Sequence, residues 1–147
     1  PKANSLGKIK EGSEIRHRMG DVGWIDQKDR IWFCGRMSHR VVTAKETSFT
    51  IPCESIFNNH PQVFRSALVG VGPRYQQKPI ICIELNKSDD GINKTRLKKE
   101  LLDVAAANEL TKSIKTLLFH KSFPVDIRHN SKIFREKLSH WAGKKVK

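Results

Sequence analysis

The sequence contains few cysteines: Cys34, Cys53 and Cys82 are the three it has. Their spacing matches no CxxC metal or redox pattern, and an odd count argues against a disulfide framework. Each cysteine lies among apolar neighbours, where a free thiol behaves as a small buried hydrophobe. These features predict buried, reduced thiols and a cytoplasmic location.

Long apolar runs are also lacking. No stretch approaches the roughly 18 apolar residues that cross a bilayer, so no transmembrane segment is predicted. Residues 1–10 carry basic side chains without the apolar core of a secretory signal. The sequence begins with Pro1 and not with Met, from which we expect a processed or truncated piece of a longer protein.

Two further absences concern ligand sites. The six histidines include no i, i+4 pair and no His–Cys cluster with zinc spacing, so no metal site is predicted. No glycine-rich phosphate-binding loop occurs in the sequence either. A nucleotide bound by this chain would therefore take its main phosphate contacts from elsewhere.

Positive charge is what the sequence has in excess. It contains 28 Lys and Arg against 15 Asp and Glu, a formal net charge of +13. Such an excess attracts phosphate-rich partners, which include nucleic acid, anionic membrane and nucleotides. A small basic nucleic-acid-binding domain is therefore one hypothesis. Aromatic residues are few, however, and the apolar strands lack ribonucleoprotein-type aromatic pairs, so we expect no nucleic-acid partner.

Short apolar runs in the first third of the sequence predict two β-hairpins. Residues 22–25 and 31–34 flank a polar turn, and residues 39–44 and 48–51 flank another. Residues 1–14 are polar and contain two glycines, and we expect them to form a loop or a frayed end.

Runs of branched apolar residues predict strands in the rest of the sequence, and apolar residues at helical spacing predict helices. The predicted strands are 63–71 and 80–85, both central, and 117–119 at an edge. The predicted helices are a short one opened by Pro52, one over 94–109 capped by Asn93, and one over 132–141. Because the elements do not alternate as βαβ units, the predicted class is α+β: a small mixed sheet of about three strands with helices packed on it, preceded by β-hairpins.

Two polar residues at strand ends have the chemistry needed to hold a nucleotide sugar. Asp21 lies between Gly20 and Gly23, and its carboxylate offers two acceptor oxygens to vicinal hydroxyls. Arg36 follows an apolar strand, and its planar fork of donors can reach hydroxyls or a phosphate. Taken alone, each residue is better explained structurally, Asp21 as a turn aspartate and Arg36 as a surface arginine.

Taken in order, these residues resemble the adenylate-forming superfamily, which includes acyl-CoA synthetases, luciferases and the adenylation domains of peptide synthetases. In that family a Gly-Asp-x-Gly motif precedes a Gly-Arg motif by a step of fifteen residues from Asp to Arg, and the same step leads from Asp21 to Arg36. The resemblance implies that these two residues bind the ribose hydroxyls of ATP and AMP. It also implies a hinge at Ser38, with residues 1–37 ending an N-terminal AMP-binding domain and residues 38–147 forming a C-terminal lid.

The segment after the expected hinge both extends the resemblance and departs from it. The family starts a helix with Pro-x-Glu, which Glu54 matches, although a carboxylate in a first helical turn is also favoured by the backbone dipole. The family hairpin carries Lys-x-x-Gly, whereas residues 41–48 contain no glycine. In coenzyme A-using members that hairpin lines the pantetheine tunnel, so the departure argues against thioester formation.

The last motif adds a catalytic candidate. The family ends with Ser-Gly-Lys-Ile-x-Arg, and here Lys132 is followed by Ile133 and Arg135. The resemblance implies that Lys132, on a mobile lid, stabilises the charge that develops at the α-phosphate and the carboxylate. Arg128 and His129 fall in the same motif and are further candidates. The alternative for Lys132 is a surface lysine at the start of the last helix.

A narrower resemblance links residues 32–36, 39–41, 50–54, 125–130 and 132–138 to the β-lactone synthetases of bacterial long-chain olefin biosynthesis. It implies that a β-hydroxy fatty acid is adenylated and then closed to a β-lactone with release of AMP, without coenzyme A. Magnesium would accompany ATP and bind mainly outside this chain, and the partner would be the N-terminal AMP-binding domain of the same protein. The isolated chain is expected to be inactive. A fatty acyl-CoA ligase lid and a plain interaction module are the alternatives.

Overall fold

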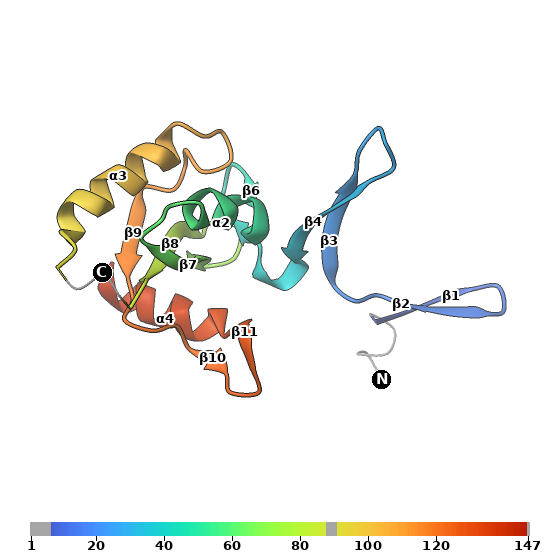
Figure 1. Ribbon diagram of the computed structural model, residues 1–147. Helices are drawn as coiled ribbons and strands as arrows, with labels where there is room; N and C mark the ends of the chain where they lie inside the picture. The colour runs from blue at the N-terminus through green and yellow to red at the C-terminus, as the bar shows by residue number, and fades with distance from the viewer. Residues whose placement is uncertain (1–6, 88–90, 147) are drawn as a thin grey trace.

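The computed structural model describes residues 7–87 and 91–146. A three-stranded sheet with the order β7-β8-β9 lies at the centre of the larger part of the molecule (Figure 1). β7 (Val63–Val71) runs antiparallel to β8 (Lys78–Leu85), and β9 (Thr116–Phe119) runs parallel to β8. The predicted α+β class and the small mixed sheet are therefore confirmed.

Helices cover both faces of this sheet. They are α2 (Thr50–Asn58), α3 (Lys94–Ala106) and α4 (Arg135–Lys145). Figure 1 shows α3 and α4 on opposite sides of the strands. Because successive side chains of a strand point to opposite faces, β7 and β8 supply two apolar clusters. The cluster beneath α2 and α3 includes Phe57, Leu68, Ile81, Ile83 and Leu101. The cluster beneath α4 includes Ala67, Val69, Ile80, Cys82 and Leu138.

Two hairpins precede this domain and extend away from it in Figure 1. The first pairs β1 (Lys8–Glu11) with β2 (Glu14–His17), and the second pairs β3 (Asp21–Ile25) with β4 (Ile31–Arg36). A short 3₁₀ helix, η1 (Met37–His39), follows, and then β5 (Val41–Val42) pairs with β6 (Thr47–Ser48). The β3–β4 and β5–β6 hairpins are the two that the sequence predicted, and the second is shorter than predicted because residues 50–51 belong to α2.

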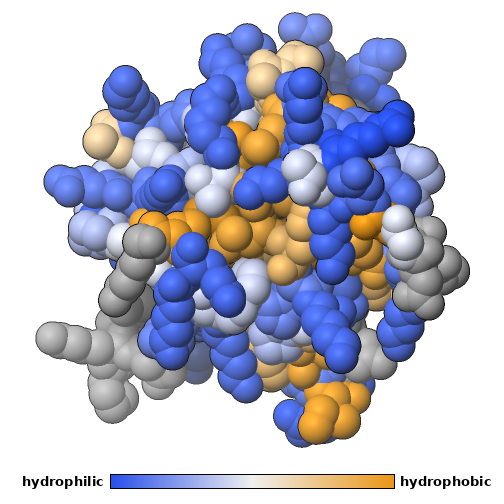
Figure 2. Space-filling model, turned by 90° about the vertical axis from the view of Figure 1, so that its left-hand side faces the viewer, coloured by the Kyte–Doolittle hydropathy of each residue, from blue (hydrophilic) through white to orange (hydrophobic). Residues whose placement is uncertain are grey.

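The surface on the side of α3 is mostly hydrophilic. Figure 2 shows this face covered mainly by hydrophilic side chains, with apolar side chains gathered toward its middle. Lys94, Arg96, Lys98 and Lys99 of α3 are exposed and supply part of the positive charge. Within the described residues, no helix is both long enough and apolar enough to cross a membrane.

The prediction of a loop over residues 1–14 is wrong for the part that the structure describes. Residues 8–17 form the β1–β2 hairpin, in which Glu11 pairs with Glu14 around a two-residue turn. Gly12 adopts a φ of +61°, which such tight turns require and which glycine allows without steric cost. The strands are short and exposed, so no apolar pattern marked them in the sequence.

Three smaller predictions also need correction. Pro52 is the third residue of α2, because Phe49 is its N-cap, and α3 ends at Ala106, before Glu109. The predicted cap of α3 is confirmed, since the Asn93 side chain accepts a hydrogen bond from the Arg96 N–H. β7 is an edge strand and not a central one. Side chains, including that of Ser139, occupy part of its outer edge, which explains how so apolar a strand can lie there.

The largest correction concerns Lys132, which was expected at the start of the last helix. It lies on β11 (His129–Ile133), which pairs with β10 (Val125–Asp126), and α4 begins only at Arg135. The Phe134 N–H donates to the Pro124 carbonyl at 2.8 Å and closes this hairpin. Ile133 packs against the α4-side cluster from the strand. An inward apolar residue at position 133 is thus compatible with a helix or with a strand, and for this reason the sequence pattern predicted a helix from Lys132.

Candidate functional site

Asp21 and Arg36 face each other across the β3–β4 pair. Arg36 Nε donates to Asp21 Oδ1 at 3.0 Å, and Arg36 Nη1 donates to the Met19 carbonyl at 2.6 Å. The Asp21 side chain is 41% exposed and the Arg36 side chain 51% exposed. Both residues therefore sit on an accessible surface and keep hydrogen-bonding groups that a ligand can reach.

Gly35 places the end of β4 directly against the first turn of α2. Its φ is +111°, and a Cβ added there would lie 2.3 Å from Thr50 Oγ1. Only glycine fits so close an approach in that backbone conformation. The Gly35-Arg36 step thus fixes how β4 leaves the hairpin and meets the domain that follows.

An open cavity of 690 Å³ lies where the hairpin meets this domain. Three of the residues expected to act together, Arg36, Ser38 and Lys132, all line it. Lys132 is exposed on β11, and Ser38 lies in η1 between two residues of extended backbone. Asp21 is not one of the lining residues and meets the cavity through its ion pair with Arg36.

The cavity has a strongly positive lining. Besides Arg36 and Lys132 it includes Arg135, and His39 lies beside them; neither Arg135 nor His39 was predicted as a site residue. Burial lowers the pKa of His39, and the positive charges of Arg135, Arg36 and Lys132 lower it further, whereas Glu136 opposes them. The lowered pKa favours the neutral imidazole, and the charge that the cavity offers to a phosphate-bearing ligand comes from Lys132 and from Arg36 and Arg135, which are also paired with Asp21 and Glu54.

Glu54 has a different place from the one expected. It lies in the second turn of α2, so the first-turn dipole explanation does not apply. Its carboxylate accepts two hydrogen bonds from Arg135, at 2.5 and 2.9 Å, and one from the Leu68 N–H at 2.7 Å. Burial raises the pKa of Glu54, and the Arg135 guanidinium opposes that rise. Glu54 does not line the cavity, which indicates a structural contact within the domain.

The two remaining candidates lie on the β10–β11 hairpin. The Arg128 side chain is 84% exposed at the hairpin tip, where its N–H donates to Asp126 Oδ1 at 2.9 Å. Arg128 is not among the residues that line the cavity. The side chain of His129 lies outside the part that the structure describes.

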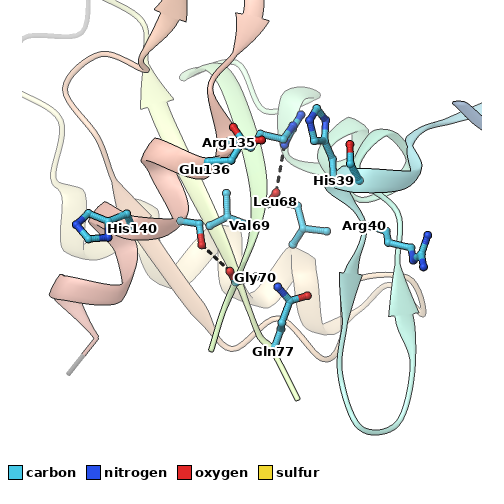
Figure 3. A pocket seen from close by; sticks show the side chains of 11 residues that line it. His39, Arg40, Leu68, Val69, Gly70, Gln77, Arg135, Glu136 and His140 are labelled. Atoms are coloured by element: carbon cyan, nitrogen blue, oxygen red, sulfur yellow. Dashed lines mark hydrogen bonds between the residues drawn. The ribbon is translucent and has the colours of Figure 1, made fainter. Parts of the chain in front are cut away.

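A second cavity, of 380 Å³, adjoins the first (Figure 3). Ser38, His39 and Arg135 line both cavities. Figure 3 shows His39 and Arg135 beside each other, with Gln77 and Arg40 farther along the cavity wall.

No group of His, Cys, Asp and Glu side chains in the described ranges is suited to hold a metal ion.

The β5–β6 hairpin closes without glycine. Thr43 Oγ1 accepts hydrogen bonds from the Lys45 and Glu46 N–H groups at 3.1 and 3.0 Å, a turn in which a hydroxyl replaces a backbone acceptor. Gln77 holds the hairpin from the side: its Oε1 accepts from the Val42 N–H at 2.9 Å, and its own N–H donates to the Val42 carbonyl at 3.1 Å. The hairpin is thus tied to the loop before β8.

Comparison with known proteins reveals two curated relatives. The chain is 51% identical over 134 residues to an olefin beta-lactone synthetase from Xanthomonas campestris pv. campestris, covering 90% of this chain and 24% of the relative. It is 43% identical over 148 residues to an olefin beta-lactone synthetase from Stenotrophomonas maltophilia, covering 97% of this chain and 26% of the relative. The chain spans about a quarter of the length of each relative. No family model matches it.

Solved structures share the fold. An anthranilate CoA ligase in complex with anthranoyl-AMP superposes with a TM-score of 0.75 at 21% identity, covering 92% of this chain and 26% of the ligase. ATP-bound MatB from Rhodopseudomonas palustris superposes with a TM-score of 0.71 at 17% identity, covering 93% of this chain and 26% of MatB. The hairpins and the α+β domain therefore occur together in larger proteins.

Proposed function

We propose that this chain, a member of the adenylate-forming superfamily similar to a part of the olefin β-lactone synthetases, is the C-terminal lid of an enzyme that activates a carboxylic acid with ATP. The observation that carries the proposal is the cavity lined jointly by Arg36, Ser38 and Lys132. Residues far apart in the sequence meet there around a surface of positive charge.

The proposed chemistry follows from the charges that must meet. Acyl adenylation joins a carboxylate to the α-phosphorus of ATP and expels pyrophosphate, so two anions approach each other. Asp21 and Arg36 would hold the ribose hydroxyls, and Lys132 would place its ammonium at the α-phosphate. Lys132 then stabilises charge that is greatest in the transition state, which lowers the barrier more than it strengthens binding.

Ser38 is proposed as the pivot of the lid. It lies in a three-residue 3₁₀ helix flanked by extended residues, Arg36 and Arg40. Such an element can absorb a change in backbone angles without disturbing the sheet. Rotation at Ser38 would bring Lys132 toward the nucleotide and withdraw it after the reaction. The closed position would exclude water while the reaction takes place.

We assign residues 1–37 to the end of an N-terminal AMP-binding domain and residues 38–147 to the lid. Both apolar clusters are built from residues at or after Val41. The β3–β4 hairpin instead exposes Trp24, Ile31 and Trp32, with the two tryptophans stacked at 5.8 Å between ring centroids. Apolar side chains exposed together in this way are suited to packing against the rest of a longer polypeptide.

The proposed substrate is a β-hydroxy fatty acid, which closes to a β-lactone with release of AMP. The names of the two relatives support this choice. The glycine-free β5–β6 hairpin, tied down by Gln77, also favours a reaction without a pantetheine thiol. We expect Mg²⁺ to enter with ATP and bind mainly outside this chain, and the free buried cysteines favour a cytoplasmic location. A fatty acyl-CoA ligase lid is the alternative.

The experiment uses the full-length enzyme with ATP, Mg²⁺ and a β-hydroxy fatty acid. Carboxylate-dependent pyrophosphate exchange reports adenylation, and mass spectrometry identifies the product. Lactone and AMP formed without coenzyme A support the proposal, whereas a thioester formed only with coenzyme A selects the ligase alternative. The isolated chain should show no exchange, because it lacks a phosphate-binding loop.

A further inference from the structure

Arg135 joins three elements of the lid. It is the first residue of α4, and its guanidinium donates to both carboxylate oxygens of Glu54 on α2. Its Nη1 also donates to the Leu68 carbonyl of β7 at 3.2 Å. The Arg135 and Glu54 side chains are only 13% and 7% exposed, so this bidentate pair is shielded from solvent.

The same residue lies three positions after Lys132. β11, which carries Lys132, pairs with the two-residue strand β10, and that pairing contains an irregularity between Val125 and Asp126. So short a ladder constrains a strand weakly. The fixed point at the C-terminal end of β11 is the turn into α4, where Arg135 attaches the chain to α2 and to the edge of β7.

The ion pair also borders the proposed site. Arg135 lines the 690 Å³ cavity together with Lys132, whereas Glu54, which holds it, does not. The position of the Arg135 guanidinium is thus set from outside the cavity, by a carboxylate that is itself held by the Leu68 N–H. A change at Glu54 would therefore reach the guanidinium that lines the cavity directly, through its ion pair with Arg135.

We propose that Arg135, held by Glu54, is a positioning residue that fixes the strand end carrying Lys132, so that the ammonium of Lys132 meets the reacting phosphate. This inference rests on the proposed function of Lys132. It assigns to Glu54 and Arg135 a role in the speed of adenylation besides their role in the fold. Misplacement of a catalytic group by about 1 Å can cost about 100-fold in rate.

The test is a double-mutant cycle in the full-length enzyme, read by pyrophosphate exchange. The variants are Arg135→Lys and Glu54→Gln, each made alone and in a Lys132→Ala background. With Lys132 present, each should lower kcat by roughly 10- to 100-fold while the KM for ATP changes little. With Lys132→Ala, the same changes should cost less than about threefold, because the group that they position is gone.

The chain offers a matched control in its other buried carboxylate–arginine pair. Glu84 accepts from Arg65 Nε at 2.8 Å and from the Phe123 N–H at 2.7 Å, and neither Glu84 nor Arg65 lines the cavity. Glu84→Gln and Arg65→Lys should lower the thermal unfolding midpoint as much as the test variants do. Their exchange activity at a temperature well below that midpoint should remain within about threefold of wild type.

The outcomes separate the inference from the function on which it rests. Equal losses with and without Lys132, or equal losses in the control pair, would overturn the positioning role and leave the proposed function intact. Unchanged exchange in Lys132→Ala alone would overturn both. If Arg135→Lys fails to fold, Glu54→Gln still decides, because its amide oxygen can accept from the Leu68 N–H and keep the shape of the buried side chain.

Discussion

Arg36 Nε lies 3.0 Å from Asp21 Oδ1, so the two residues proposed to hold the ribose hold each other across β3 and β4. The pairing fixes both side chains at the mouth of the cavity before a nucleotide arrives. A ribose would then meet a preformed carboxylate and guanidinium, which lowers the entropy cost of binding. An ion pair this exposed contributes only about 0–1 kcal/mol to folding. A substitution that breaks it should therefore affect nucleotide binding much more than stability.

Asp21→Ala should therefore weaken ATP binding far more than it weakens the fold. Losing a hydrogen bond to a charged group costs about 1.5–3 kcal/mol, so the KM for ATP of the full-length enzyme should rise roughly 10- to 100-fold. Glu11→Ala is the matched control, because Glu11 forms a similarly exposed cross-strand pair with Arg16 at 2.9 Å. A KM unchanged in Asp21→Ala, or raised equally in both variants, would remove Asp21 from the site.

Gly35→Ala should destabilise the chain by about 2–4 kcal/mol in denaturant unfolding. The positive φ costs about 1–3 kcal/mol for a residue with a Cβ, and the new methyl would collide with Thr50 Oγ1. Thr50→Ala removes that oxygen. Adding it to Gly35→Ala should therefore cost less than the sum of the two single changes. Strict additivity would show that the close approach of β4 to α2 is not what requires glycine.

His39 should make the stability of the lid depend on pH. Burial and three neighbouring cations lower its pKa in the folded state, whereas the unfolded chain titrates near the ordinary value of about 6.5. The unfolded state then binds more protons just below that value. The His39 contribution is therefore complete above about pH 6.5 and is lost as the pH falls through the window below it.

The measurement for His39 is the free energy of unfolding of the chain between about pH 5 and pH 7.5, in wild type and His39→Gln. Glutamine keeps a polar side chain of similar length and does not titrate. The variant should lose less stability than wild type on acidification. An identical decline in the two proteins would mean that His39 is as easily protonated when folded as when unfolded.

The proposed boundary at residue 38 predicts that residues 38–147 fold alone. Both apolar clusters lie within this segment, so it should unfold cooperatively in circular dichroism at a midpoint close to that of the whole chain. A chain shortened after Phe134 is the contrasting control. It lacks Leu138 and Ala142, which complete the α4-side cluster, and should lose cooperative unfolding. If the 38–147 segment does not fold on its own, the domain boundary lies elsewhere.

The elements that the sequence predicted well are those whose signal is local. The branched apolar runs of β7 and β8 identified the central sheet, and Asn93 marked the start of α3. The ordered motifs pointed to the adenylate-forming superfamily and to a likeness with olefin β-lactone synthetases; the two curated relatives bear that name, and the solved structures share the fold. These signals depend on neighbouring residues or on fixed spacing, and both can be read along the chain.

What could not be predicted depends on contacts between distant residues. Glu54 and Arg135 are 81 positions apart, and each had a plausible reading without the other. His39 follows the proposed hinge residue Ser38 with no motif of its own, and its lowered pKa depends on burial and on cations that folding brings beside it. Lys132 was predicted to lie on a helix, whereas it lies on β11. The inward apolar residue beside it, Ile133, suits a helix and a strand equally well, so it could not distinguish the two.

The proposed function depends above all on the action of Lys132 at the phosphate, and pyrophosphate exchange by full-length Lys132→Ala measures that action. Lys137→Ala is the control, since Lys137 is an exposed lysine of α4 whose ammonium lies over the Phe134 ring. Lys132→Ala should lower the exchange rate by about 100- to 1,000-fold, the loss expected for one preorganised electrostatic contact, with the free energy of unfolding unchanged within about 0.5 kcal/mol. Lys137→Ala should retain wild-type exchange. Wild-type exchange in Lys132→Ala would show that Lys132 is not the group that acts on the phosphate.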